Sequence, residues 1–226
     1  MNERIDGITV LIPAFNAANT LDTLLARLTR YVPPENVLVV NDGSTDETLN
    51  IAERRGIKVI SLEKNQGKGA ALRKGFNVLQ NDPNVEDVVT LDADLQHRPE
   101  DISRFVQKKK QGGADIVIGL RNRTGTRMPI HRVLSNAITS YLVSLRTRTN
   151  ILDSQCGFRL IGKNVLLNVT IESSGFEAET EFLIKAIKQG FKIEFAPIET
   201  IYSGEQSHMT NWKTTMNFMR VLFRDY

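Results

Sequence analysis

The sequence is poor in the residues that build metal centres from sulfur and imidazole. Its 226 residues include one cysteine, Cys156, and three histidines, His97, His131 and His208, set far apart. A single cysteine excludes a disulfide within the chain, and so few thiol and imidazole groups argue against a zinc site. We expect Cys156 to be a buried packing residue and the protein to work in the reducing cytoplasm.

Long apolar runs and strong charge bias are also missing. No segment approaches the ~18 consecutive apolar residues that cross a bilayer, and the first residues lack the apolar stretch of a secretory signal. Apolar residues make up 41% and charged residues 24%, which is typical of a globular chain. A net charge of +3 gives no reason to expect a nucleic-acid partner. We therefore expect one folded domain over residues 1–226.

Acidic residues are absent from one long window, between Asp115 and Asp153. The arginines of that window are Arg121, Arg123, Arg127, Arg132, Arg146 and Arg148. Such a stretch is typical either of an anion-binding surface or of a solvated basic face, and the composition alone leaves both open.

The first half of the chain alternates short apolar runs with helical patterns. The expected strands cover residues 8–12, 36–40, 58–62, 88–91 and 115–119, and the expected helices 20–31, 45–55, 69–80 and 99–111. This alternation predicts an α/β fold with a mostly parallel central sheet and helices on both faces. The second half is less regular, with helices expected at 130–145, 177–189 and 211–226 and a strand at 191–195.

Ligands of such sheets bind beyond the carboxyl ends of the strands. The loops at those ends are polar or rich in glycine: residues 13–16, 41–44, 65–69, 92–96 and the segment from Arg121 onward. These loops are therefore the candidate functional segments.

The pair Asp92 and Asp94 follows the fourth expected strand, with Gln96 two residues further on. Carboxylate and amide oxygens at this spacing suit Mg²⁺ or Mn²⁺, and such a metal can neutralise a departing diphosphate. The same pattern is also compatible with a helix cap followed by a solvated acid.

Asp42 and Lys68 are the other candidates in this half. Asp42 ends a strand, where its carboxylate could accept hydrogen bonds from a base or ribose, while Ser44 or Thr45 is expected to cap the next helix. Lys68 could contact a phosphate, or the loop around it could be only a turn that enters a helix. The nucleotide-binding and hydrolase motifs GxxxxGK[ST], GxGxxG and GxSxG are absent.

Four ordered motifs carry a family resemblance: Pro13-Ala14-Phe15-Asn16, Asn41-Asp42-Gly43-Ser44, Asn65-Gln66-Gly67-Lys68-Gly69 and Asp92-Ala93-Asp94-Leu95-Gln96-His97. Together they resemble family 2 glycosyltransferases with the Rossmann-like GT-A fold. The segments 92–101, 157–160 and 175–177 are similar to the branch that transfers mannose or glucose to dolichyl or polyprenyl phosphate. Ala17 departs from the family pattern, because many relatives have glutamate there, and many relatives also carry transmembrane helices.

The resemblance implies a nucleotide-sugar donor, such as GDP-mannose or UDP-glucose, bound by residues 1–120. It places Pro13, Phe15 and Asn16 on the nucleobase and ribose and Asp42 on the base. Lys68, Asp92 and Ala93 would also contact the donor. Asp92, Asp94 and Gln96 would hold Mg²⁺ or Mn²⁺ on the diphosphate.

The resemblance further implies that residues 121–210 bind a polyprenyl phosphate, with Arg121, Arg132 and Ser135 on its phosphate. That phosphate would attack the anomeric carbon in line and invert it, while Asp94 and the metal stabilise the leaving diphosphate. Two alternatives stay open. One is a sugar-hydroxyl acceptor, which would need a base such as Glu177 or Glu179, and the other is a non-catalytic nucleotide-sugar-binding protein.

The terminal helix, residues 211–226, is amphipathic. Arg220 and Arg224 accompany Phe218, Leu222 and Phe223, a composition compatible with a membrane surface, with docking on the protein's own core, or with a second subunit. We favour docking, and the oligomeric state stays open.

Overall fold

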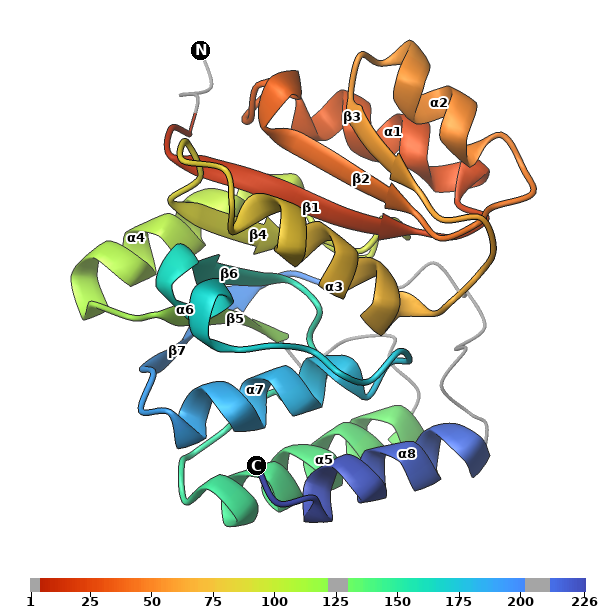
Figure 1. Cartoon of the computed structure of the whole chain (residues 1–226). Helices are drawn as coiled ribbons and strands as arrows, with labels where there is room; N and C mark the ends of the chain where they lie inside the picture. The colour runs from red at the N-terminus through yellow and green to blue at the C-terminus, as the bar shows by residue number, and fades with distance from the viewer. Residues whose placement is uncertain (1–4, 122–129, 202–211) are drawn as a thin grey trace.

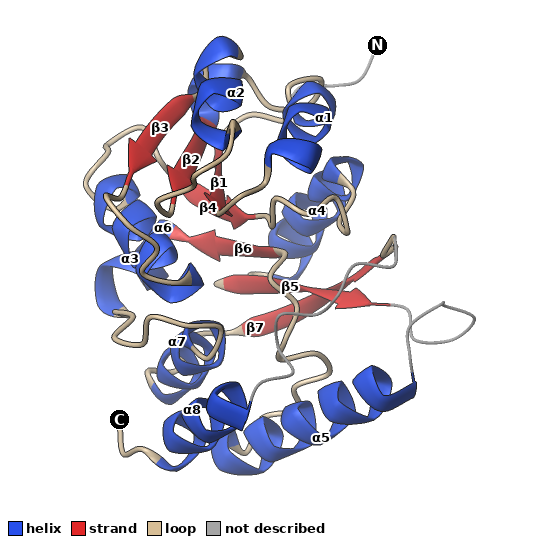
Figure 2. Cartoon of the chain, turned by 90° about the vertical axis from the view of Figure 1, so that its right-hand side faces the viewer, coloured by secondary structure: helices blue, strands red, loops and turns tan. Residues whose placement is uncertain are grey.

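The computed structural model describes residues 5–121, 130–201 and 212–226, and within these the side chains of 130–132 and 212–213 are not described. A single seven-stranded sheet forms the centre of the chain (Figure 1). Figure 2 shows this sheet between α1 and α4 on one side and α3 and α7 on the other. The expected α/β fold with helices on both faces is confirmed.

The strands do not lie in the sheet in the order of the chain. They are β1 (Ile8–Ala14), β2 (Val37–Asn41), β3 (Lys58–Ser61), β4 (Asp87–Thr90), β5 (Ile116–Arg121), β6 (Arg159–Gly162) and β7 (Ile193–Ile198), in the order β3-β2-β1-β4-β6-β5-β7. All six expected strands are present, with ends shifted by up to three residues. Parallel pairing joins β1 to β2 and β4, β2 to β3, and β5 to β7.

β6 is the strand that the sequence pattern did not predict. It runs antiparallel between β4 and β5, with Arg159 opposite both Thr90 and Ile118. Four residues that begin with a charged side chain give no period-2 pattern, so only the pairing partners reveal the strand. The insertion brings the segment just before β6 to the carboxyl ends of β4 and β5.

The helices are α1 (Ala18–Leu28), α2 (Thr48–Arg54), α3 (Lys68–Leu79), α4 (Ile102–Gly112), α5 (Ile130–Thr147), α6 (Lys163–Asn168), α7 (Ala178–Lys188) and α8 (Trp212–Phe223). Only α6 was not expected. The expected cap of α2 by Ser44 or Thr45 is wrong, because α2 begins at Thr48 and it is the Asp46 carboxylate that accepts the Thr48 N–H, at 3.0 Å. Ser44 instead contacts the loop after β1.

The core lies between the sheet and the helices that cover it. The apolar face of α1 is fully buried, at Leu21, Leu24, Leu25 and Leu28, and burying each such side chain contributes about 1.5–3 kcal/mol. On the other face, a Cβ on Gly75 would lie 2.4 Å from Leu11 Cδ1, so α3 packs directly on β1. This close packing fixes where α3 begins, at the carboxyl edge of the sheet.

α5 and α8 lie side by side below α7 in both views (Figures 1 and 2). Val221 and Leu222 of α8 are buried, and Arg146 of α5 donates hydrogen bonds to the carbonyl oxygens of Leu222 and Arg224, at 3.1 and 3.2 Å. The terminal helix therefore docks on the protein's own fold, as favoured from its sequence.

Candidate functional site

The loops after β1 and β2 form one surface. The Asn16 N–H donates to Ser44 Oγ, and the Thr45 N–H donates to Asn16 Oδ1, both at 2.9 Å. Asn16 adopts a left-handed backbone conformation with φ +48°, which asparagine tolerates better than most residues. Pro13 is half-buried in β1, whereas the Phe15 ring is 48% exposed. An exposed aromatic ring on a fixed loop is a surface on which a nucleobase can stack.

Asp42 lies at the end of β2 with its carboxylate turned into the protein. The side chain is 3% exposed, and its two oxygens accept the backbone N–H groups of Gln66 and Gly67, both at 2.8 Å. The carboxylate that the resemblance placed on the base therefore binds the neighbouring loop.

A cluster of opposite charges lies beyond the carboxyl end of β4, where the first turns of α3 and α7 meet Asp92. Lys68 Nζ, at the first turn of α3, lies 2.7 Å from Asp92 Oδ1 and 2.9 Å from Glu179 Oε2. Burial lowers the pKa of Lys68, but the two carboxylates outweigh it and the net pKa is raised. Burial likewise raises the pKa of Asp92, and the Lys68 ammonium reverses this and holds it below its usual range. Lys68 and Asp92 are therefore both charged at neutral pH.

Gly157 lets the chain pass directly against this cluster. A Cβ there would lie 2.6 Å from Asp92 Oδ2, 2.9 Å from Lys68 Nζ and 3.0 Å from Glu179 Oε1. Two residues later, the buried Arg159 donates hydrogen bonds to the carbonyl oxygens of Cys156, Ser154 and Glu179, at 2.8, 2.9 and 2.8 Å. Arg159 thus ties the segment before β6 to the start of α7.

In the sequence, Gly157 and Arg159 stand out only as family markers, and Glu179 only as a candidate base. Their contacts join segments far apart in the chain, so no local pattern reports them. The one available signal was the combination of a glycine and an arginine within a short apolar segment, where a buried arginine needs several acceptors.

The loop after β4 presents the expected metal ligands. Asp94 Oδ1 accepts the Gln96 N–H at 3.0 Å, and Leu95 between them has φ +60°. Ala93 is buried between the partly exposed Asp92 and Asp94. Among the described residues no three His, Cys, Asp or Glu side chains gather as a metal cluster. The carboxylate oxygens of Asp92 and Asp94 and the amide oxygen of Gln96 are still the ligand types that Mg²⁺ and Mn²⁺ take.

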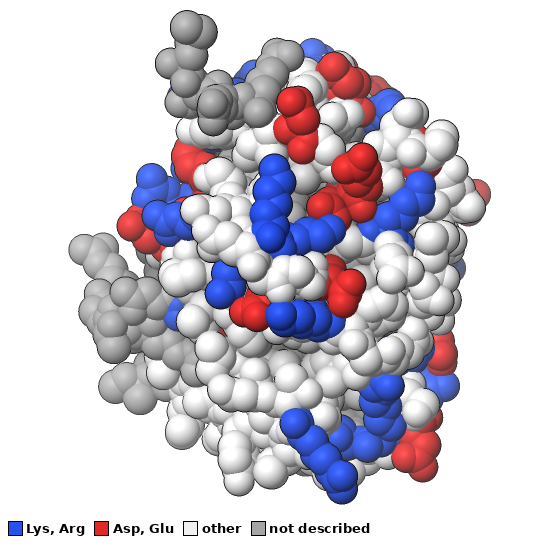
Figure 3. Space-filling view, turned by 90° about the vertical axis from the view of Figure 1, so that its left-hand side faces the viewer, with Lys and Arg blue, Asp and Glu red and all other residues white. Residues whose placement is uncertain are grey.

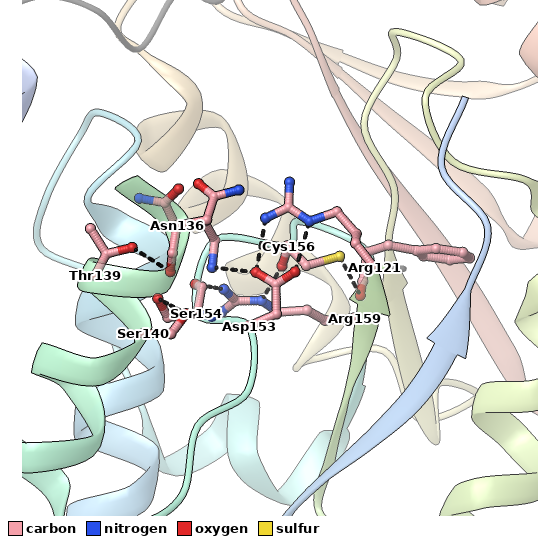
Figure 4. A network of polar contacts seen from close by, with 10 residues as sticks. Arg121, Asn136, Thr139, Ser140, Asp153, Ser154, Cys156 and Arg159 are labelled. Atoms are coloured by element: carbon pink, nitrogen blue, oxygen red, sulfur yellow. Dashed lines mark hydrogen bonds and ion pairs between the residues drawn. The ribbon is translucent and has the colours of Figure 1, made fainter. Parts of the chain in front are cut away.

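A second polar network lies beyond the end of β5 (Figure 4). Arg121 grips Asp153 in a bidentate pair, with Nε 2.7 Å and Nη2 2.8 Å from the two carboxylate oxygens, and Asp153 is fully buried. On α5, Ser140 Oγ accepts the Ser154 N–H at 3.0 Å, and Asn136 is buried on the same helix face. The network holds the Arg121 guanidinium in a fixed plane at the edge of the sheet.

Ser135 and Arg132, the two other residues predicted to bind the acceptor, are not part of the network around Arg121 that the structure describes. Ser135 is exposed, one position away from the inward face of α5 that carries Asn136 and Ser140. Arg132 belongs to α5, but its side chain lies outside the described residues, as do those of His131 and His208.

His97 and Cys156 are buried beside the site. Burial lowers the pKa of His97 to about 4, so the imidazole is neutral, and its ring packs against Phe158 with centroids 5.4 Å apart. Burial raises the pKa of the Cys156 thiol to about 12, which leaves it protonated and unreactive. Cys156 is fully buried, as its sequence context predicted.

The sheet order and the polar loops beyond the strand ends define an α/β domain whose candidate site lies at the carboxyl edge of the sheet. The model of Glycosyl transferase family 2 matches residues 9–169, so the chain belongs to this family.

Two similar proteins have names that describe the transfer of a sugar to a lipid phosphate. A UDP-N-acetylglucosamine–dolichyl-phosphate N-acetylglucosaminyltransferase of Methanococcus voltae is 28% identical over 87% of this chain and 86% of its own. A dolichol-phosphate mannosyltransferase of Pyrococcus furiosus is 29% identical over 96% of this chain and 63% of its own.

A crystal structure of glucosyl-3-phosphoglycerate synthase from Mycobacterium tuberculosis, in complex with Mn²⁺ and UDP, matches with a TM-score of 0.77. It is 21% identical in sequence and covers 96% of this chain and 78% of its own, so the likeness shows the GT-A fold alone.

Proposed function

We propose that this glycosyltransferase moves a hexose from a nucleotide-sugar to a polyprenyl phosphate, with inversion at the anomeric carbon. The observation that carries the proposal is the Arg121–Asp153 pair at the end of β5. It fixes a guanidinium beside the Lys68–Asp92–Glu179 cluster, inside a stretch of chain that has no acidic residue from 116 to 152. Asp153 takes the Nε and Nη2 side of this guanidinium, so the pair orients the group, and the other arginines of the acid-free window supply the positive charge that a phosphate needs.

The donor fits the edge formed by residues 1–120. Phe15 offers a ring for the nucleobase, and Asn16 and Pro13 border it. Asp92, Asp94 and Gln96 would hold Mg²⁺ or Mn²⁺, which when bound neutralises the charge that develops on the leaving diphosphate. Lys68, beside Asp92, adds a fixed positive charge at the same place. GDP-mannose, UDP-glucose and UDP-N-acetylglucosamine are the donors to test.

The state of the glutamates favours a phosphate acceptor over a sugar hydroxyl. Glu179 Oε2 is 2.9 Å from the Lys68 ammonium, and Glu177 Oε1 accepts hydrogen bonds from the Gly175 N–H and Asn217 Nδ2, at 3.3 and 3.4 Å. A hydroxyl acceptor requires a base, and the carboxylates of Glu177 and Glu179 already have partners within the protein. A phosphate monoester is already an anionic nucleophile and needs positioning instead. Arg121, Arg132 and the buried Asn136 are our candidates for that task, with Ser135 less favoured because of its exposure.

A membrane surface fits the face formed by α5 and α8. Exposed apolar residues follow helical spacing on both helices: Leu134, Ile138, Tyr141 and Leu145 on α5, and Met216, Met219 and Phe223 on α8. Neither helix carries an acidic residue, and Lys and Arg side chains gather at the lower end of the molecule in Figure 3, the end that α5 and α8 occupy in Figure 1. An apolar face with a basic rim suits anionic lipid.

Among the helices that the structure describes, none combines the length and apolarity needed to cross a bilayer. Contact through the α5 and α8 face would bring the enzyme to a lipid-bound acceptor. The test is sedimentation with phosphatidylglycerol vesicles. Ile138→Glu should reduce vesicle binding, whereas Val78→Glu, at an exposed apolar residue of α3, should not. Loss of self-association in Ile138→Glu with unchanged vesicle binding would instead identify the face as a subunit interface.

A transfer assay tests the function. The protein is incubated with each labelled donor, Mn²⁺ and a polyprenyl phosphate in detergent, and label is counted in the organic phase. We expect metal-dependent label that is abolished by Asp94→Ala and strongly reduced by Arg132→Ala and Arg121→Lys. Arg148→Ala, at an exposed arginine of the same acid-free window, is the matched control. Donor hydrolysis without lipid label would refute the lipid acceptor and move attention to a hydroxyl acceptor and Glu179.

A further inference from the structure

The chain beyond β7 crosses to the loop that follows β4. Ile198, the last residue of β7, lies opposite Arg121 in the parallel register with β5. Three residues later, the Ile201 N–H donates to the Gln96 carbonyl oxygen at 2.9 Å. We name Glu199–Ile201 the crossing segment. It joins the strand end beside Arg121 to the loop that carries the expected metal ligands.

The crossing segment runs antiparallel to the chain that follows Gln96. Thr200 forms an antiparallel backbone bridge with His97, and the Glu199 carboxylate pairs with the Arg98 guanidinium. In the part of the chain that the structure describes, His97 Nδ1 and Thr200 Oγ1 are buried and make no hydrogen bond. The link at this point is therefore made by the backbone and not by these two side chains.

The loop that receives the crossing segment has an unfavourable backbone conformation. Leu95 has φ +60°, the left-handed region that a residue with a Cβ rarely adopts. Two hydrogen bonds on the next residue support it: the Gln96 N–H donates to Asp94 Oδ1 at 3.0 Å, and the Gln96 carbonyl oxygen accepts the Ile201 N–H. A strained conformation persists only where surrounding contacts determine it. Loss of the bond from Ile201 should therefore release Gln96 from its place.

We propose that Glu199–Ile201 is a positioning segment, whose backbone holds the loop from Asp94 to Gln96 in the conformation that binds the metal. The link needs the Ile201 N–H and not the Ile201 side chain, which is 43% exposed. The effect on metal binding rests on the proposed function, because Gln96 is one of the residues that would hold Mg²⁺ or Mn²⁺. The hold on the Gln96 backbone does not depend on it.

Ile201→Pro and Ile201→Ala separate the N–H from the side chain. Proline removes the N–H and restricts the preceding residue to extended backbone, which Thr200 already has in its bridge. Alanine keeps the N–H. Hydrogen exchange of the Gln96 amide is followed by NMR without metal or substrate. We expect exchange about two- to tenfold faster in Ile201→Pro, the worth of one backbone hydrogen bond, and unchanged in Ile201→Ala. Equal Gln96 rates in the two variants would overturn the inference.

A surface variant tests the same link if Ile201→Pro does not fold. Glu199→Arg replaces the ion pair with Arg98 by two like charges and leaves the backbone N–H groups in place. Its matched control is Glu194→Arg, because Glu194 of β7 pairs with Lys108 at 3.3 Å, away from the crossing segment. We expect the Gln96 and Ile201 amides to exchange about twofold faster or more in Glu199→Arg only. No acceleration there, or the same acceleration in the control, would also overturn the inference.

Metal binding separates positioning from a purely structural role. Mn²⁺ affinity is measured by electron paramagnetic resonance in the unchanged protein, Ile201→Ala, Ile201→Pro, Gln96→Ala and the double variant of proline and alanine. Positioning predicts about two- to tenfold weaker binding in Ile201→Pro than in Ile201→Ala, and little further loss from proline once Gln96 is alanine. Equal affinities of the two Ile201 variants, or additive losses, would refute positioning. If the unchanged protein binds no Mn²⁺, the proposed metal site fails, while the exchange rates still decide the hold on Gln96.

Discussion

Replacing Lys68 with methionine removes the positive charge from a largely buried cluster. The ammonium lies 2.7 Å from Asp92 Oδ1 and 2.9 Å from Glu179 Oε2, and the side chains of these two acids are 26% and 11% exposed. Deleting one partner of a fully buried pair costs about 3–5 kcal/mol. Because Asp92 is partly open to solvent, which screens the charge, we expect the free energy of unfolding to fall by about 2–3 kcal/mol at pH 7. For a chain of this size that corresponds to a lower Tm by roughly 5–10 °C.

The loss of stability in Lys68→Met should become smaller as the pH falls. In the unchanged protein burial raises the pKa of Asp92, but Lys68 reverses this and lowers it, so its stabilisation is present above the unfolded pKa and is lost as pH falls through the folded value. Without Lys68, burial and the nearby Glu179 remain, and they raise the folded pKa above the unfolded one. The folded variant then binds a proton more readily than its unfolded chain. The difference in the free energy of unfolding between the unchanged protein and Lys68→Met should therefore become smaller as pH falls from 7 toward about 4.

Urea unfolding at several pH values measures this gap. Lys74→Met is the matched control, because Lys74 is an exposed lysine of the same helix. Addition of Mn²⁺ should stabilise Lys68→Met more than the unchanged protein, since a cation can take the vacated place between the carboxylates. Equal stability of Lys68→Met and Lys74→Met at pH 7, or a gap that does not change with pH, would refute the electrostatic reasoning.

Three further predictions concern the edge of the sheet. Phe15→Ala should weaken nucleotide binding about five- to a hundredfold, the worth of one stacked base, and leave the Tm unchanged; calorimetric titration with UDP and GDP measures this, and unaltered affinity would remove the ring from the donor site. Gly157→Ala should disturb Asp92 and reduce Mn²⁺ affinity, because its Cβ would lie 2.6 Å from Asp92 Oδ2; paramagnetic relaxation of water reports the bound metal, and unaltered Mn²⁺ affinity would contradict the close approach. Arg159→Lys should lower the free energy of unfolding by about 2–4 kcal/mol, because a lysine cannot reach three carbonyl oxygens at once; a loss below 1 kcal/mol in urea would show that the bonds are replaced by water.

The parts of the fold that the sequence predicted are those with a strong local pattern. Runs of β-branched residues such as Val37–Asn41 are buried on both faces of a parallel strand, and that environment selects them. The loops after these strands could be located for the same reason, since parallel strands place their carboxyl ends together. Asp92 and Asp94 were found in this way.

The rest depends on contacts between distant segments. Glu179 meets Lys68 across 111 positions of the chain, and Arg159 finds its acceptors only after β6 has entered the sheet. The sequence motif around Asp42 predicts only the end of a strand, and it does not predict that the carboxylate turns toward the Gln66–Gly67 loop. One signal was available: helical phase alone puts Asn136 with Ser140, and not Ser135, on the inward face of α5.

The position of β6 has a consequence for how the molecule can be divided. A cut after residue 120 would separate the donor-binding segments from the rest, yet it would leave β4 and β5 without the strand that lies between them. Both would then expose unpaired backbone groups, which makes a fragment 1–120 prone to aggregation rather than to independent folding. The donor-binding half and the acceptor-binding half therefore share one sheet, and neither can be exchanged as a unit with that of a relative. A chimera that changes acceptor preference has to graft loops, such as the residues between β5 and β6, and keep β6 in place.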